Sequence, residues 1–176
     1  LFTGTSYNDN NGRYMMSLVT PQSTPVTIPA NSVVSTALRT GVDSDVLVIW
    51  MGTNGLTVGG SFTPEQLVDY HNMAINYAAT KKNIIIGLHT GDLNSRKTQE
   101  EAMQKAFGLR YINLRKYMVE QGLVDAGLEP TQEDTEFINQ GKCPPQLLMD
   151  GTHFTTIGYT LVGKLVYQRG VSLGYW

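Results

Sequence analysis

The chain has 176 residues, of which 41% are hydrophobic and 16% charged, and its formal net charge is -2. This length suits one α/β domain with a sizeable core, and the composition excludes a disordered chain. The small net charge, with no basic run longer than two residues, makes nucleic acid and a membrane poor candidates for partners. Cys143 is the only cysteine, which excludes an internal disulfide and a cysteine-based metal cluster.

Residues 1–41 are predicted to form a β-rich segment. Thr, Ser, Asn and Pro dominate its first part, without helical periodicity. Residues 6–15 predict a β-hairpin, because Asn11-Gly12 readily adopts the positive φ angles of tight hairpin turns. The chain starts with Leu1 rather than Met, which fits either a processed product or an incomplete sequence.

The character of the sequence changes after residue 41. The apolar run Val46–Trp50 is typical of a buried parallel strand. A helix is expected to begin at Thr63-Pro64-Glu65-Gln66, which combines an N-cap threonine, a proline at the first helical position and a capping-box glutamine. Further strands are expected at residues 83–88 and 110–114, and further helices at about residues 98–107, at about 115–121 and from about 156. Residues 122–149 are interpreted as a long irregular segment.

This alternation of strands and helices predicts an α/β fold with a parallel central sheet. Helices on both of its faces would make a three-layer α/β/α domain over residues 42–176. Only three central strands are evident, fewer than such a domain usually has. We therefore expect that the domain begins upstream of Leu1.

The tetrapeptide Asp150-Gly151-Thr152-His153 is a candidate catalytic element. An aspartate three residues before a histidine can accept a hydrogen bond from the Nδ1–H of the imidazole, which leaves Nε2 free to take a proton from a nucleophile. The element precedes the last predicted helix, near the sheet edge where open α/β folds bind their ligands. An Asp-Gly turn with a helix-capping role is the alternative interpretation.

The tripeptide Gly52-Thr53-Asn54 directly follows the strand Val46–Trp50. At such a position the side-chain amide of Asn54 can donate to a developing acyl oxyanion, and Gly52 lets the backbone approach closely. Glycine and asparagine are also common turn residues, so a simple strand-to-loop turn is the alternative.

Together, the two elements resemble conserved blocks of the SGNH (GDSL-like) hydrolase family. Residues 48–54 resemble its third block, GxND, although Gly55 stands where many members have aspartate. Residues 150–159 resemble its fifth block, in which DxxH precedes a helix start with small residues. The resemblance covers residues 42–176 and implies a flavodoxin-like SGNH fold.

The same resemblance implies a serine esterase that needs no metal or organic cofactor. In such an enzyme Asn54 would be an oxyanion donor next to Gly52, His153 the general base and Asp150 the acid that orients it. The stretch 110–150 also resembles SGNH modules of bacteriophage tail and tail-fibre proteins, which are similar to carbohydrate esterases. This implies an O-acetylated carbohydrate as substrate, a virion or secreted location, and an oligomer if the chain belongs to a phage fibre. A non-catalytic phage tail or glycan-binding module is the alternative function.

The position of the nucleophile stays open between two interpretations. Gly4-Thr5-Ser6 resembles the first block of the family, which makes Ser6 a candidate nucleophile. However, the strand before it would be short and polar, and a hairpin follows where the family has a helix. On the other interpretation, the nucleophilic serine lies upstream of Leu1 and residues 1–41 are the end of an insertion within the domain.

Several other side chains have mainly structural interpretations. His71 falls on the apolar face of a helix and is predicted to be a satisfied core histidine. His89 either faces the expected cleft or forms a local hydrogen bond in a loop. Trp50 and Tyr159 are interpreted as core residues rather than sugar-stacking platforms, and the charges of residues 96–101 as a solvated face. The three histidines lack the spacing of a metal site.

Overall fold

The computed structural model describes residues 2–7, 14–18, 20–25, 27–30, 32, 45–53 and 62–176. The chain divides into two compact units, Leu1–Thr36 and Ala37–Trp176. The expected segment boundary between residues 41 and 42 lies outside the described residues. Each unit is considered by itself.

The first unit contains a β-hairpin. Strand β1 (Phe2–Tyr7) pairs antiparallel with β2 (Tyr14–Leu18), and the register is irregular between Thr5 and Tyr7. The antiparallel pairing confirms the predicted hairpin, although the predicted turn at residues 11 and 12 lies outside the described residues. Ser6 lies in β1, and its side chain is likewise not described. Its role as nucleophile stays a prediction.

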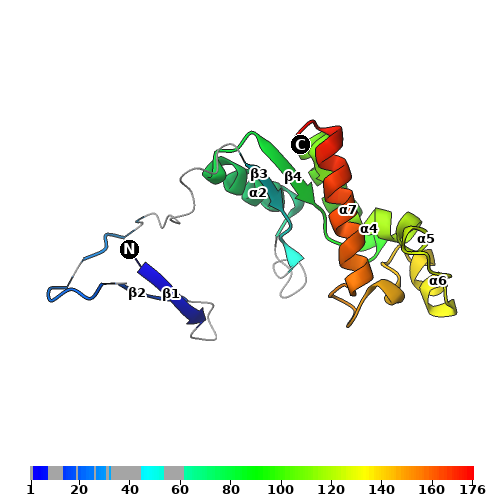
Figure 1. Cartoon of the computed structure of the whole chain (residues 1–176), viewed down its shortest axis with the longest axis horizontal. Helices are drawn as coiled ribbons and strands as arrows, with labels where there is room; N and C mark the ends of the chain where they lie inside the picture. Colours follow the sequence, from blue (N-terminus) through cyan, green and yellow to red (C-terminus); the bar gives the residue numbers. More distant parts are fainter. Residues whose placement is uncertain are drawn as a thin grey trace. The chain divides into compact units, whose positions relative to one another are not determined.

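The second unit is built on a parallel sheet of three strands in the order β3-β4-β5. Figure 1 labels β3 and β4 of this sheet. The strands are β3 (Val46–Ile49), β4 (Lys82–Ile86) and β5 (Tyr111–Ile112). Val46 lies opposite Lys82, and Ile86 opposite Ile112. The helices α2 (Pro64–Ala78) and α3 (Leu93–Phe107) make the two connections between parallel neighbours. The predicted α/β class and parallel sheet are confirmed.

Both faces of this sheet are covered. Ile85 packs with buried residues of α2 and α3, among them Leu67 and Phe107. Ile86, its neighbour on β4, packs on the opposite side with Leu161 of α7 (Thr156–Ser172). Since successive side chains of a strand point to opposite faces, the helices lie in two layers around the sheet. Figure 1 shows α7 alongside this sheet.

The helices on the first face begin at side-chain caps. At α2, the Thr63 hydroxyl accepts from the Gln66 N–H, and the Gln66 side chain accepts from the Thr63 N–H. This confirms the predicted capping box. Helix α3 begins at Leu93, five residues before the predicted start, because Asp92 and Ser95 cap it reciprocally.

The prediction of an irregular segment over residues 122–149 is wrong. The helical run that starts after β5 continues through α4 (Leu114–Tyr117), a π-helical stretch η3 (Met118–Gly122) and α5 (Leu123–Ala126). Helix α6 (Gln132–Asn139) and the 3-10 turn η4 (Pro145–Leu147) follow. Helix α6 is short and mostly polar, and Phe137 and Ile138 are its only large apolar residues, so a window of helical length contains too few apolar positions to reveal it.

Asp134 ties α6 to η4. Its carboxylate accepts from the N–H and the hydroxyl of Thr131, and from the N–H and the side-chain amide of Gln146, at 2.6 to 3.1 Å. The residue is completely buried. This cluster fixes the chain just before the segment that carries Asp150 and His153.

No helix in the described part of the chain is long and apolar enough to cross a membrane.

Candidate active site

The segment Leu147–Thr155 forms a tight loop at the N-terminal end of α7. Leu148 and Phe154 form an isolated antiparallel bridge, and the Met149 N–H donates to the His153 carbonyl at 2.7 Å. At the tip, Gly151 has φ +80°, a backbone conformation that glycine adopts without steric cost. These backbone contacts fix the segment that carries Asp150 and His153.

Asp150 and His153 form the predicted hydrogen-bonded pair. The Oδ2 atom of Asp150 lies 2.7 Å from Nδ1 of His153. Its Oδ1 atom accepts from the N–H groups of Thr152 and His153, at 3.0 and 2.7 Å. Because a carboxylate can only accept, Nδ1 carries the hydrogen, and the neutral ring keeps its lone pair on Nε2.

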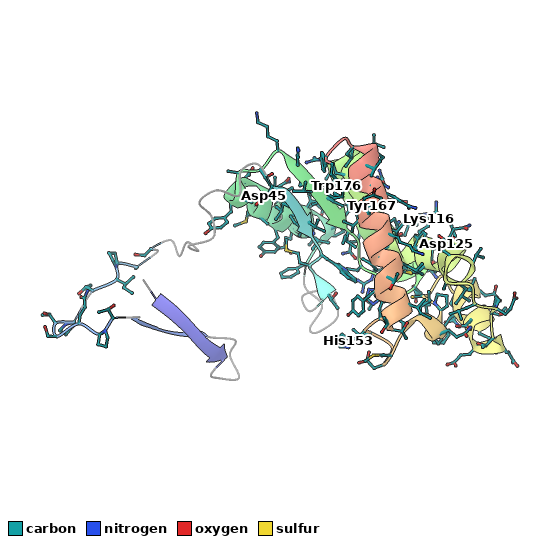
Figure 2. The ribbon with its side chains drawn as sticks, viewed as in Figure 1. Asp45, Lys116, Asp125, His153, Tyr167 and Trp176 are labelled. Atoms are coloured by element: carbon teal, nitrogen blue, oxygen red, sulfur yellow. The ribbon has the colours of Figure 1, made fainter. Side chains whose placement is uncertain are left out.

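The electrostatics of the loop keep Asp150 ionised. The backbone N–H of His153 has the largest effect, and together with the His153 ring and the Thr152 N–H it lowers the pKa of Asp150 to about 2. The side chains remain open to solvent, with 65% of His153 and 53% of Asp150 exposed. Figure 2 shows His153 at the surface beside the start of α7. Its Nε2 atom makes no hydrogen bond to any residue that the structure describes.

The loop lies at the carboxyl edge of the sheet, as predicted. Phe154 is buried, and its ring centroid lies 6.0 Å from that of Trp50, the residue after β3. The same ring lies 4.2 Å from that of His89, which follows β4. The Thr152 carbonyl accepts from Nε2 of His89 at 2.6 Å. Residues that follow two parallel strands therefore contact the loop that carries Asp150 and His153.

The second predicted element reaches the same edge, because Gly52 follows Trp50 by two residues. Gly52 has φ +115°, which an L side chain would rarely adopt. An apolar hollow of about 280 Å³ lies beside it and is lined by Met51, Gly52, Phe62, Leu67, Tyr70 and Ala74. Asn54 lies outside the described residues, so its role as an oxyanion donor stays a prediction.

At this site one aromatic prediction is wrong, and one of the two alternatives for His89 is excluded. Tyr159 is 49% exposed rather than part of the core, and its ring meets those of Trp50 and Phe154 edge-on. His89 does not form a local hydrogen bond, because its partner Thr152 lies 63 residues further along the chain. The continuous run of apolar residues identifies the strand before His89, but it carries no signal for this distant contact.

The prediction of a solvated charged face over residues 96–101 is also wrong in part. Arg96 is buried and donates to the carbonyl and the hydroxyl of Thr90. Glu100 accepts from Asn113 and, with both carboxylate oxygens, from the buried guanidinium of Arg115. His71 is buried as predicted, and its Nδ1 bonds the Leu67 carbonyl, but its Nε2 has no partner among the described residues.

Cysteine and metal chemistry are poorly supported among the described residues. Cys143 is buried, and this burial, together with the charge of Asp134, raises the pKa of its thiol to about 12. A thiol that stays protonated is a poor nucleophile, so Cys143 is not the partner of His153. Within the described ranges, no group of three or more His, Cys, Asp or Glu side chains could hold a metal ion.

The candidate site thus combines an exposed Asp150–His153 pair, the buried Phe154 and His89 beneath it, and Gly52 at the same sheet edge. Comparisons of the chain with protein-family models, with curated proteins and with solved structures found no match.

Proposed function

We propose that this chain is a serine esterase with an SGNH-type, flavodoxin-like fold that hydrolyses acyl esters, chiefly O-acetyl esters of carbohydrates. The observation that carries the proposal is the Asp150–His153 pair, with its 2.7 Å bond to Nδ1 and an exposed ring. A parallel sheet whose strand ends lie directly below the pair supports the same interpretation. Gly52, in the stretch that resembles the family's third block, follows β3 at the same edge with φ +115°.

In the proposed reaction, Nε2 of His153 removes the proton of a serine hydroxyl as its oxygen attacks the acyl carbon. The ester C–O bond then breaks, and His153 returns the proton to the sugar oxygen that leaves. Water then attacks the acyl-enzyme. His153 takes the proton of this water and returns it to the serine oxygen as the acid leaves. Asp150, charged over the whole neutral range, stabilises the imidazolium in each step, and the Asn54 amide donates to the oxyanion.

The surroundings of His153 support a carbohydrate substrate. Tyr159 presents a half-exposed ring held edge-on by Trp50 and Phe154, a suitable platform for the apolar face of a sugar. Met149, which precedes Asp150, is 72% exposed. Because the pair stands at the surface rather than in a deep pocket, an ester on a long polysaccharide could reach it.

One observation favours a second candidate, a glycan-binding module that keeps the fold without turnover. Among the described residues, no serine hydroxyl hydrogen-bonds to His153. Such a module would use the exposed Tyr159 and Met149 without a nucleophile.

Serine-directed labelling separates the two candidates. The protein, together with any residues that precede Leu1 in the complete sequence, is treated with a fluorophosphonate. The adduct is located by peptide mass mapping, alongside hydrolysis of an activated acetyl ester. The esterase proposal expects turnover and a serine adduct, both lost in His153→Ala. A label on Ser6 would identify the nucleophile within this chain. Glycan binding without turnover and without an adduct would establish the second candidate and contradict the first.

The variant Asn54→Ala tests the oxyanion role separately. Removing a donor that acts mainly on the oxyanion should lower kcat by roughly 10²–10³ and leave KM nearly unchanged. Full activity of this variant would remove Asn54 from the mechanism.

A further inference from the structure

His89 links the central sheet to the candidate catalytic loop. It directly follows Leu88 at the end of the buried run that contains β4, and only 5% of its surface is exposed. Its Nε2 lies 2.6 Å from the Thr152 carbonyl. Because a carbonyl can only accept, the hydrogen is on Nε2 and Nδ1 is unprotonated in the neutral ring. This Nδ1 atom is buried and has no partner among the described residues.

The peptide group between Thr152 and His153 is consequently held at both ends. Its carbonyl oxygen accepts from His89, and its N–H donates to Oδ1 of Asp150 at 2.7 Å. Rotation of this peptide would break both bonds and would change the backbone torsion angles on either side of it, including the φ angle of His153. The His89 bond therefore acts on the same structural unit as the Asp150–His153 pair.

The His89 ring is itself firmly placed. It packs against the buried Phe154 ring at 4.2 Å and edge-on against Trp50 at 5.8 Å. The strand before it, with Ile84 and Ile85 fully buried, is the central strand of the sheet. Dense packing of this kind transmits position well, because buried side chains have little room to move.

We infer that His89 is a positioning residue, which transfers the fixed position of β4 to the loop 150–153 and thereby sets the direction of the His153 imidazole. The effect on catalysis rests on the proposed esterase function, whereas the effect on loop geometry does not.

The charge state of His89 fits this role. Burial lowers its pKa, the bond to the Thr152 carbonyl acts against that shift, and the charges of His153 and Arg96 lower the pKa further. The ring thus stays neutral at physiological pH, with a single tautomer that can donate to Thr152. A proton taken up by His153 during the reaction would strengthen the preference of His89 for its neutral form.

Three variants isolate the hydrogen bond. His89→Phe keeps an aromatic ring against Phe154 and removes the donor, while His89→Gln keeps an N–H donor at similar reach and removes the ring. His71→Phe is the matched control, because His71 is also buried and bonds a carbonyl, that of Leu67 within α2, away from the loop.

The first measurement uses long-range ¹H–¹⁵N NMR spectra of the full chain without substrate. The chain has three histidines, so assignment needs few variants. The wild type should show His89 protonated on Nε2 and His153 on Nδ1. In His89→Phe the His153 ring should become a mixture of both tautomers, while His89→Gln and His71→Phe retain the Nδ1–H form. A wild-type His89 protonated on Nδ1 would overturn the inference without any variant, as would an unchanged His153 ring in folded His89→Phe.

The second measurement is the hydrolysis of an activated acetyl ester by the protein together with any residues that precede Leu1 in the complete sequence. His89→Phe should lower kcat by roughly 10- to 100-fold with KM within about twofold, because a misdirected base affects the chemical step. His89→Gln should recover most of that loss, and His71→Phe should match the wild type. An active wild type with full kcat in His89→Phe would overturn the positioning role alone. Absence of hydrolysis in the wild type would contradict the proposed function, and the NMR result would still decide on His89.

Discussion

Two aspartates close turns in the C-terminal half of the chain by similar hydrogen bonds, but in opposite environments. Asp134 is completely buried, and its carboxylate accepts only from groups of Thr131 and Gln146. Asp150 is half-exposed. One of its carboxylate oxygens accepts from two backbone N–H groups, and the other accepts from the His153 ring. Burial of the carboxylate, rather than the type of its hydrogen bonds, thus distinguishes the structural aspartate from the candidate catalytic aspartate.

The reason lies in the cost of burying charge. Burial by itself would raise the pKa of Asp134, but the bonds from Thr131 and Gln146 outweigh it and leave the pKa below its usual value. Such a carboxylate needs all its acceptor positions and has none left for a reaction. Asp150 remains in contact with water, so it can serve an imidazole whose charge changes during a reaction.

The largest expected effect is on the activity of Asp150→Asn. The asparagine carbonyl can still accept from the backbone, but its amide cannot accept from Nδ1 of His153, so the ring loses its tautomer control. We expect kcat to fall by about 10³–10⁴. The urea unfolding midpoint should change little, because the side chain is exposed. Steady-state kinetics with an acetyl ester and urea denaturation measure the two quantities; full activity would remove Asp150 from the mechanism.

Asp134→Asn should show the opposite pattern. The new amide would face the donors of Thr131 and Gln146, which leaves buried groups unpaired and should cost about 2–4 kcal/mol of unfolding free energy. The kcat of the folded fraction should match the wild type. Asp125→Asn is the control, since Asp125 is exposed and bonds the Tyr117 hydroxyl. Equal stability of the two variants in urea would contradict the assigned difference in burial.

Acid should destabilise the second unit in two stages. Burial lowers the pKa of His71 and of His89 below 6.5, so below pH 6.5 the unfolded chain binds protons that the folded chain does not, and stability falls with pH. The lowered pKa of the buried Asp134 carboxylate adds a second loss below pH 3.8. Urea unfolding at several pH values should show both stages, and His71→Phe should weaken only the first. Stability that rises from pH 6.5 to 5 would contradict the buried histidines.

A smaller effect is expected at the tip of the loop Leu147–Thr155. Gly151→Ala introduces a Cβ atom with open space around it but at φ +80°, which should cost about 1 kcal/mol. Gly127→Ala imposes a similar strain at φ +68°, in the turn after α5. Both should lower the unfolding free energy alike, whereas only Gly151→Ala should also lower kcat by several-fold, because the strain acts beside His153. Equal kcat values would show that the loop absorbs the strain elsewhere.

The site was predictable wherever its bonds are local. Asp150 and His153 are three residues apart, so the motif alone specifies their hydrogen bond. The same holds for the capping box between Thr63 and Gln66. Helix α6 also has a reciprocal cap, between Thr131 and Asp134, but this signal was missed because aspartate replaces the usual glutamate or glutamine.

Local patterns in the sequence predict the α/β class, the order of the three parallel strands along the chain, and the Asp150–His153 pair. Apolar runs and short motifs encode these features within a few residues. Three other features depend on how the fold packs: His89 bonds the loop, Arg115 pairs with Glu100, and Tyr159 faces solvent. These contacts join segments up to 63 residues apart. Burial and hydrogen-bond partners at such separations depend on how the layers pack, which no local pattern specifies.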